Sequence, residues 1–416
     1  MQNQKKMSFL LRILLSAALF NLSYWVADYC GFCILFFLFP LYSFFVRNLN
    51  LKRLFNVGLG WGILAFGGNL FWVYVLISTK ADCSKFIAFL IYFVLVLLMA
   101  VTAGFFFILL KLFLDKFKNR ALKIFIFLFG WYLYFLFLAD YFPRIIGKNV
   151  RYPFILPVVP LSSFKFFLKM VSWVFLPFNG SYKEKINCDF LYLKPHSQYL
   201  DKSRAELAGD IYCKIKYLNS DKRLYNNNVN EIIIAPESMF PFVLNYDLKV
   251  LNLVEKVLLP KQKLIIGAKR QEGEKYFQSV YVIEQGRIIQ FYDKTIMMPF
   301  GEKLSKFWKT YFNFAADFFL KNKIALSKGK SSTKTFVLND NCEGIPRICS
   351  EFFWQNDKQL IPFATKQNKV ILAFVDDDWF CSYLRKLMTN YAAFKSAKLG
   401  VSIIYIDFSG VTKFQN

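Results

Sequence analysis

The most reactive side chain that the sequence offers is a thiol near its C-terminal end. The segment Ile345-Pro-Arg-Ile-Cys349-Ser-Glu351-Phe-Phe-Trp354 ends an apolar run in a cysteine and places a carboxylate two residues later. Such a cysteine can act as a nucleophile, but it needs a base, because an ordinary thiol is only slightly ionised at neutral pH. His196 is the single histidine and lies in a distant polar segment. A carboxylate is therefore the favoured base.

Two upstream segments supply carboxylates and an ammonium group. Glu237 follows the apolar run of Glu-Ile-Ile-Ile-Ala-Pro-Glu-Ser, and Lys294 and Glu302 lie in Phe-Tyr-Asp-Lys-Thr-Ile-Met-Met-Pro-Phe-Gly-Glu. Glu237, Lys294 and Cys349 each fall where a predicted strand ends. Loops at such positions can gather side chains from several strands on a rigid scaffold.

This ordered set of motifs resembles the apolipoprotein N-acyltransferases, membrane enzymes with a nitrilase-type domain. The family pattern reads PES, KxxLxPFGE, CxE and an NDAWF-like segment. The matching stretches here are Pro236-Glu237-Ser238, residues 294–302, residues 349–351 and Val375-Asp-Asp-Asp-Trp379-Phe380. The pattern from Trp61-Gly62 to Trp72-Val73 also resembles the membrane region of the family. The resemblance thus covers nearly the whole chain, and four motifs in series argue against a chance origin.

The resemblance implies a reaction and a role for each residue. Cys349 would accept a fatty acyl chain from a membrane phospholipid as a thioester and pass it to the α-amino group of a lipoprotein's N-terminal diacylglyceryl-cysteine. Glu237 would be the base, and Lys294 would stabilise the thiolate and the oxyanion. Glu302 and Glu351 would support the site. Three aromatic residues would contact substrate: Tyr152, Phe154 and Trp379. Neither a cofactor nor a metal is implied, and a monomer is expected.

Composition independently indicates a membrane protein. Of the 416 residues, 56% are hydrophobic and 51 are Phe, which is too apolar for an ordinary soluble chain. The formal charge of +25 is scattered singly along loops without a nucleic-acid-binding motif, so it fits contact with anionic lipid headgroups instead. Cys30 and Cys33 form a C-x-x-C in apolar surroundings, which argues against a metal or redox role. The consecutive acids Asp376, Asp377 and Asp378 point in different directions and do not predict a metal site.

The apolar runs predict a multi-span helical membrane domain over residues 1–178. They cover residues 8–26, 31–46, 57–77, 86–110 and 122–139, lengths that suit the hydrocarbon thickness. The first run lacks a convincing cleavage site, so we expect a retained helix. Basic residues fall on alternate loops, which the positive-inside rule places in the cytoplasm. This orientation puts the end of the fifth run outside.

The second domain is expected to lie on the periplasmic side of a bacterial inner membrane, as in the family. One more full span would return it to the cytoplasm, so residues 143–178 are expected to form a compressed helix pair or a re-entrant segment. The stretch Arg151-Tyr152-Pro153-Phe154 resembles the family's loop facing the active site. Two interpretations of it are equally open: it lines an entry path for lipid, or it is a plain connector.

Residues 179–416 predict an α/β nitrilase-like domain, an α-β-β-α sandwich shortened at its C-terminus. Helices are expected at 205–219 and 248–258, and strands at 231–235, 264–268, 277–284, 287–292, 347–349, 370–375 and 401–407. Gln285-Gly286 reads as a hairpin turn. Residues 304–319 could be a lid or membrane-touching arm, or an ordinary amphipathic helix.

The sequence departs from the family pattern at several positions. Ala235 replaces a Trp, Ser350 replaces a Tyr, and residues 376–378 replace Asn-Asp-Ala. Two rival hypotheses therefore remain. One is a nitrilase-type amidase acting on a small amide, against which the five apolar runs count. The other is a degenerate membrane protein that keeps the fold as a binding module.

Overall fold

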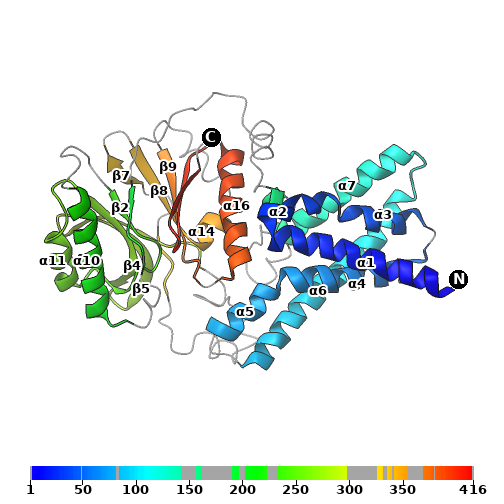
Figure 1. The fold of residues 1–416 in the computed structure, drawn as a ribbon, viewed down its shortest axis with the longest axis horizontal. Coiled ribbons are helices and arrows are strands. Elements are labelled where there is room, and N and C mark those ends of the chain that lie inside the picture. The colour runs from blue at the N-terminus through cyan, green and yellow to red at the C-terminus, as the bar shows by residue number, and fades with distance from the viewer. Residues whose placement is uncertain are drawn as a thin grey trace. The chain divides into compact units, whose positions relative to one another are not determined.

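The fold was analysed in a computed structural model that describes residues 2–47, 49–80, 84–141, 155–156, 158–161, 190–195, 202–222, 232–297, 326–330, 335–339, 342–354, 369–378 and 380–414. The chain divides into two compact units (Figure 1). The helical unit comprises residues 1–145, 151–170 and 379–394, and the sheet unit comprises residues 146–150, 171–378 and 395–416. The predicted domain boundary at residues 178/179 lies outside the described residues.

The helical unit is built from apolar helices joined by short turns. They are α1 (Gln2–Trp25), α2 (Ala27–Cys30), the 3-10 helix η1 (Gly31–Leu35), α3 (Leu38–Val46), α4 (Leu51–Asn69), α5 (Phe71–Lys80), α6 (Lys85–Leu114), α7 (Arg120–Leu136), the π-helix η2 (Phe137–Tyr141) and α8 (Val158–Leu161). The side chains of Asn50, Ser84 and Asn119 accept backbone N–H bonds at the starts of α4, α6 and α7. Each cap satisfies a donor that has no partner within its helix.

Several of these helices are candidates to cross a membrane. Met7–Trp25, Lys85–Leu114 and Arg120–Ala139 are long and apolar enough, and α4 with α5 adds a fourth span if the pair, bent by 44°, is taken as one. The predicted run at residues 31–46 has the expected bounds but is too short for the membrane span predicted there. Its η1 and α3 segments, at about 1.5 Å per residue in α-helix, fall short of the roughly 30 Å of hydrocarbon. The helical region is thus confirmed, with one predicted run too short and another broken.

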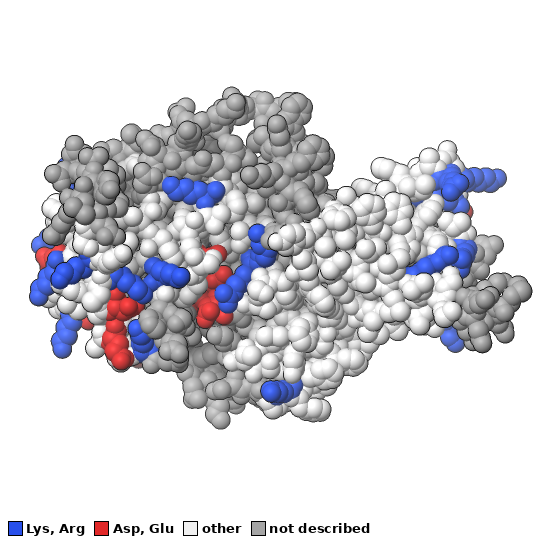
Figure 2. Space-filling model, viewed as in Figure 1, with Lys and Arg blue, Asp and Glu red and all other residues white. Residues whose placement is uncertain are grey.

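Basic side chains gather at one end of the helical unit. The buried ammonium of Lys111 in α6 donates to the Phe45 carbonyl at 3.0 Å and to Asp115 at 2.7 Å, which joins the last turns of α3 and α6. The loops and first helical turns at this end carry Arg47, Lys52, Arg53, Lys116, Lys118 and Arg120. On the face drawn in Figure 2, few charged side chains appear elsewhere on the unit. Such a basic end is the kind that faces the cytoplasm under the positive-inside rule.

Small residues let α4 and α6 pack closely. A Cβ at Gly62 would lie 2.6 Å from the Cα of Ala100, and one at Gly58 would lie 2.8 Å from the Ala103 carbonyl oxygen. Glycines four residues apart form the small-residue pattern that lets helix backbones approach within membranes. This seam fixes α4, the helix that carries the buried Trp61, against α6.

Helices α4 and α5 are separated by a break at Leu70. The Val73 N–H bonds to the Leu70 carbonyl instead of reaching four residues back. The carbonyl of Asn69 and the amide of Trp72 therefore take partners outside the helix. The Tyr383 hydroxyl serves both: it accepts from the Trp72 N–H at 3.2 Å and donates to the Asn69 carbonyl at 3.2 Å.

A second aromatic residue, Trp25, also bonds to a backbone group at this break. The Trp25 indole N–H, at the end of α1, donates to the Gly68 carbonyl at 3.1 Å, and the Trp25 ring lies 6.5 Å from that of Tyr383. The rings of Trp72 and Phe380 also meet, at 5.9 Å. The side chains of Tyr383 and Trp25, from distant parts of the sequence, thus bond to backbone groups whose helical partners the break removes.

The sheet unit contains two sheets. The first runs in the order β1 (Phe190–Tyr192), β2 (Ile232–Ile234), β4 (Lys263–Glu272), β5 (Lys275–Glu284) and β6 (Arg287–Asp293), with β3 (Phe240–Val243) also paired to β4. The second runs in the order β11 (Val411–Phe414), β10 (Ile403–Ile406), β9 (Lys369–Phe374), β8 (Cys342–Ile348) and β7 (Phe336–Asn339). Helices α10 (Arg204–Lys222), α11 (Leu248–Glu255) and α14 (Ser350–Trp354) accompany them, with the last residues of α16 (Ser382–Leu399), which belongs to the helical unit as far as Phe394.

The directions of the strands determine which loops lie at the same edge of each sheet. In the first sheet β2 and β4 are parallel, and two antiparallel pairings bring β6 back to the same direction. In the second sheet β8, β9 and β10 are parallel. Hydrogen bonds join the two sheets, since the hydroxyl of Tyr292 on β6 donates to Glu351 and that of Tyr192 on β1 donates to the Asp407 carbonyl. The loops after β2 and β6 thus share one edge, and those after β8, β9 and β10 share another.

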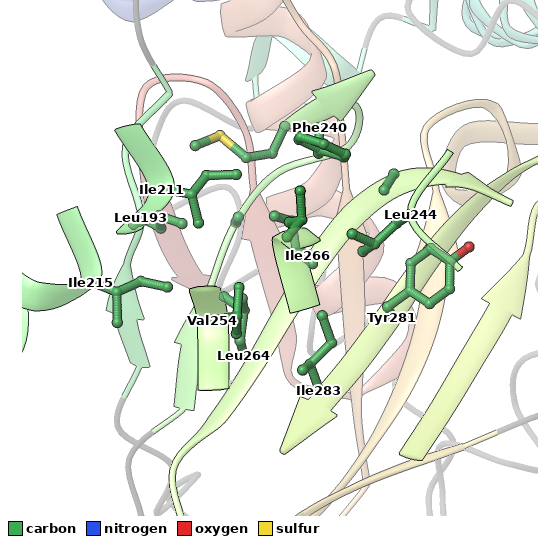
Figure 3. Close-up of a cluster of buried hydrophobic side chains, with 14 of the residues drawn as sticks. Leu193, Ile211, Ile215, Phe240, Leu244, Val254, Leu264, Ile266, Tyr281 and Ile283 are labelled. Carbon is green, nitrogen blue, oxygen red and sulfur yellow. The ribbon is translucent and has the colours of Figure 1, made fainter. Parts of the chain in front are cut away.

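The core of the first sheet lies beneath α10 and α11. Figure 3 shows apolar side chains of both helices meeting those of the strands. The cluster includes Leu193, Ile211, Ile215, Phe240, Leu244, Val254, Leu264, Ile266, Tyr281 and Ile283. With α14 beside the second sheet, the unit is a sandwich of helices on two sheets (Figure 1). The predicted fold class is confirmed: apolar helices precede an α/β sheet domain.

Most predicted elements of this unit are present with shifted ends. The hairpin turn at Gln285-Gly286 is confirmed, with φ values of 48° and 71°. Helices α14 and α16 and strands β1, β3, β7 and β11 were not predicted. Residues 304–319 lie outside the described residues.

Candidate active site

Glu237 is held on a tight loop after β2. The Ala235 N–H donates to the Ile265 carbonyl at 2.9 Å, which continues the pairing with β4. The neighbouring Ser238 has a φ of 59°, a left-handed conformation that is uncommon outside glycine. A Cβ at Gly267 on β4 would lie 2.7 Å from the Glu237 Cα, so only glycine fits beneath this loop. The Glu237 side chain is buried.

Lys294 follows β6 and reaches Glu237 directly. Its Nζ donates to Glu237 Oε1 at 3.0 Å, and its side chain is 1% exposed. The residue before it is fixed as well, because Arg270 donates to both carboxylate oxygens of Asp293 at 2.8 Å. The Lys294 N–H donates to the Gln278 carbonyl at 2.8 Å. A buried carboxylate and ammonium are thus paired at the edge where β2 and β6 end.

Cys349 ends β8 on a sharp turn. Its N–H donates to the Phe374 carbonyl of β9 at 2.7 Å, and its φ is 43°. A left-handed non-glycine residue is strained, and it persists only where the surroundings fix it. Helix α14 begins at the next residue, Ser350. Cys349 thus occupies a strand-to-helix elbow, the kind of turn that presents a nucleophile.

The amide of Asp376 connects this elbow to Glu237. Asp376 follows β9 by two residues, and its N–H donates to Glu237 Oε2 at 3.2 Å. Both Cys349 and Asp376 are thereby tied to the C-terminal end of β9. One Glu237 oxygen is bound by Lys294 and the other by the β9 loop, so the carboxylate has a fixed orientation.

Glu351 is a buried anchor between the loops. Its Oε1 accepts hydrogen bonds from the Tyr292 hydroxyl at 3.0 Å, from the Thr295 N–H and hydroxyl, and from the Ile296 N–H at 3.3 Å. Its Oε2 accepts from the Ile348 N–H at 2.9 Å. Burial, then the charge of Glu351, raises the pKa of Tyr292, so this phenol stays a protonated donor.

The loop after Lys294 is therefore locked to the elbow that bears Cys349. The hydroxyl of Ser350 adds a bond to the Ile296 carbonyl at 2.5 Å. Since Glu351 binds both sides of this junction, it fixes the two segments that carry Cys349 and Lys294.

Replacing Glu351 by glutamine is expected to lower the free energy of unfolding by about 2–4 kcal/mol, because the amide nitrogen would face N–H or O–H donors in a buried site. Thermal unfolding in detergent measures the loss. Glu343→Gln, on the preceding strand β8, is the matched control, since its pair with Lys369 is partly exposed and contributes about 1 kcal/mol or less. Equal losses for the two variants would contradict the anchoring role.

Several predicted site residues lie outside the described residues. These are Tyr152, Phe154, Glu302 and Trp379, together with His196. Within the described part of the chain, no group of three or more metal-ligating side chains could hold a metal ion. The described site therefore consists of Glu237, Lys294, Cys349 and Glu351, and their side chains are all buried.

Sequence reasoning missed the residues that support this site. Thr295 and Tyr292 flank Lys294 and donate to Glu351, but a threonine and a tyrosine near a strand end carry no distinctive pattern. Gly267 lies inside an apolar strand, where an isolated glycine is a recognised sign of close backbone approach. That signal could have been used.

The chain is similar to curated apolipoprotein N-acyltransferases, which confirms the predicted resemblance. The enzyme of Rhizobium rhizogenes is 30% identical over 201 residues, covering 43% of this chain and 36% of the relative. That of Campylobacter jejuni is 30% identical over 182 residues, covering 43% and 37%. The matches span little more than a third of these relatives' length. No family model matches.

Solved structures with some likeness include two glutamine-dependent NAD+ synthetases. That of Acinetobacter baumannii has a TM-score of 0.35 and 15% identity, covering 51% of this chain and 36% of the other. That of Cytophaga hutchinsonii has a TM-score of 0.31 and 12% identity, covering 49% and 33%. These scores are low, and the fold described above rests on the strands and helices themselves.

Proposed function

We propose that this protein transfers a fatty acyl chain from a membrane phospholipid, through a thioester on Cys349, to the α-amino group of a lipoprotein's N-terminal diacylglyceryl-cysteine. The observation that carries the proposal is the buried Lys294–Glu237 pair, with Nζ and Oε1 3.0 Å apart, in a chain whose Cys349 occupies a strained elbow. The similarity to apolipoprotein N-acyltransferases supports the choice of reaction.

In the first step Glu237 takes the proton of the Cys349 thiol. The sulfur attacks the ester carbonyl of the phospholipid and forms a C–S bond. Lys294 stabilises the oxyanion of the tetrahedral intermediate, a contribution commonly worth about 3–4 kcal/mol. The ester C–O bond then breaks, and Glu237 returns the proton to the departing lysophospholipid oxygen.

In the second step the acceptor amine attacks the thioester carbonyl. A new amide bond forms, the C–S bond breaks, and Glu237 takes the amine proton and returns it to the sulfur. Both substrates are lipids, and the apolar helices would hold them in the same bilayer, which raises their effective concentration near the site. No cofactor is required by this sequence of steps.

The proposed location is the bacterial inner membrane, with the sheet unit on the periplasmic side. The basic end of the helical unit supports a cytoplasmic position for the loops after α3 and α6. Tyr152, Phe154 and Trp379 would contact substrate and Glu302 would support the site, as the resemblance implies.

The proposal is tested by mass spectrometry. The purified full chain is mixed with phosphatidylethanolamine of defined acyl chains, and its mass is then measured. The expected result is a mass increase of one acyl group on the peptide that contains Cys349, removed by hydroxylamine and by a diacylglyceryl-cysteine peptide. If only a small amide substrate acylated Cys349, the amidase hypothesis would replace this one. If neither modified it, a non-catalytic role would.

A further inference from the structure

A buried lysine behind the elbow has no role in the reaction described above. Lys395, near the end of α16, is 1% exposed. Its ammonium donates to the Phe352 carbonyl at 2.5 Å and lies 5.0 Å from the centre of the Phe352 ring. Burying a charge is costly unless it is well paired, so such a side chain is retained where it holds something in place.

What Lys395 holds is the short helix that follows the nucleophile. Helix α14 begins directly after Cys349, and the N–H groups of Phe352 and Phe353 donate to the Cys349 carbonyl at 3.0 and 3.4 Å. The helix ends at Trp354, before the residue that would bond to the Phe352 carbonyl in a longer helix. The Lys395 ammonium occupies that acceptor instead.

Phe352 follows Cys349 by three residues, just under one turn of helix. A positive charge in the neighbourhood of a thiol favours the thiolate over the thiol. It also fixes the first turn of α14, and Cys349 keeps its left-handed conformation only while that turn is in place. One side chain can therefore affect both the charge and the orientation of the sulfur.

We propose that Lys395 is a positioning residue for Cys349, which holds α14 behind the elbow and adds a further positive charge near the sulfur. The proposal deepens the proposed function and rests on it. Other charged or titratable groups on the elements around the elbow are Arg347 on β8, Glu351 on α14, Glu237 and Lys294 after β2 and β6, Asp376 and Asp377 after β9, Tyr405 on β10 and Asp407 after β10.

The test is the rate at which iodoacetamide alkylates Cys349 in the full chain at fixed pH, followed by peptide mass spectrometry. Only the thiolate reacts appreciably, with loss of iodide, and no acyl donor is needed. Cys342 is an internal reference, because it lies on the same strand and is 7% exposed, as Cys349 is. Lys395→Met is compared with Lys395→Arg, which keeps the charge and the donors.

We expect Lys395→Met to slow alkylation of Cys349 about 10-fold, Lys395→Arg to stay within about 3-fold of the wild type, and Cys342 to react equally in all three proteins. If Lys395→Met accumulates poorly, Lys395→Gln is measured with the same expectation. An unchanged Cys349 rate would overturn the proposal, and so would a parallel change at Cys342 or a failure of arginine to rescue. A wild type that shows these rates but forms no thioester with phospholipid would instead remove the proposed function.

Discussion

Replacing Cys349 by alanine is expected to abolish acyl transfer, with a loss on the order of 10⁴-fold or more, because both steps pass through its sulfur. Transfer is measured as the mass increase of a diacylglyceryl-cysteine peptide in proteoliposomes that contain the full chain. The variant should accumulate normally, since removing one sulfur atom from this position leaves the anchoring contacts of Glu351 in place.

Cys342→Ala is the matched control for this experiment. Cys342 lies at the start of the strand that Cys349 ends, and both are equally buried. It should keep nearly full activity. Wild-type transfer by the Cys349→Ala variant would show that the acyl chain does not travel through this thiol, and the covalent mechanism would have to be abandoned.

Replacing Lys294 by methionine is expected to remove activity and to destabilise the fold at the same time. The change leaves the Glu237 carboxylate buried beside an apolar side chain, and breaking a buried ion pair on one side typically costs about 3–5 kcal/mol of unfolding free energy. The oxyanion would also lose its cation, which alone should slow acylation by roughly 10²–10³-fold. Chemical unfolding in detergent and the rate of thioester formation measure the two effects.

The double variant Lys294→Met/Glu237→Gln separates stability from chemistry. With no charge left buried, it should recover much of the lost stability while remaining inactive. Restored activity in the double variant would refute the roles proposed for both residues. If the single variant were as stable as the wild type, Lys294 and Glu237 would not form the buried pair described here.

The predictable part of the site is its order along the chain and its position at strand ends. Glu237, Lys294 and Cys349 were placed after strands by local patterns of apolar residues, and these strands exist. A supporting role for Glu351 was predicted, but not the contacts that anchor it, because four of the five hydrogen bonds it accepts come from residues more than fifty positions away. Contacts of this kind depend on the tertiary fold and leave no trace in local sequence.

The missed elements have similar physical reasons. Helix α16 contains Lys, Ser and Asn among its apolar residues, so its buried positions do not form a continuous stripe. Strands β3, β7 and β11 are four residues each, too short to show alternation. The break between α4 and α5 follows Gly67-Gly68-Asn69, residues that weaken a helix, but the surrounding run is apolar enough that hydropathy alone predicts one uninterrupted span.

The departures from the family pattern also have structural explanations. Ala235 is fully buried in the core beneath α10 and α11, where a small side chain packs. Ser350 binds the Ile296 carbonyl through its hydroxyl and so tightens the elbow. The contact from residue 376 to Glu237 is made by the backbone N–H, so an aspartate at that position preserves it.

The interruption of α4 and α5 makes two backbone groups depend on one side chain. The Trp72 N–H and the Asn69 carbonyl both bond to the Tyr383 hydroxyl, which lies more than 300 positions away in the sequence. Losing that hydroxyl would remove a hydrogen bond from both groups at once, so the local geometry of an apolar helix depends on a residue close to the C-terminal end of the chain.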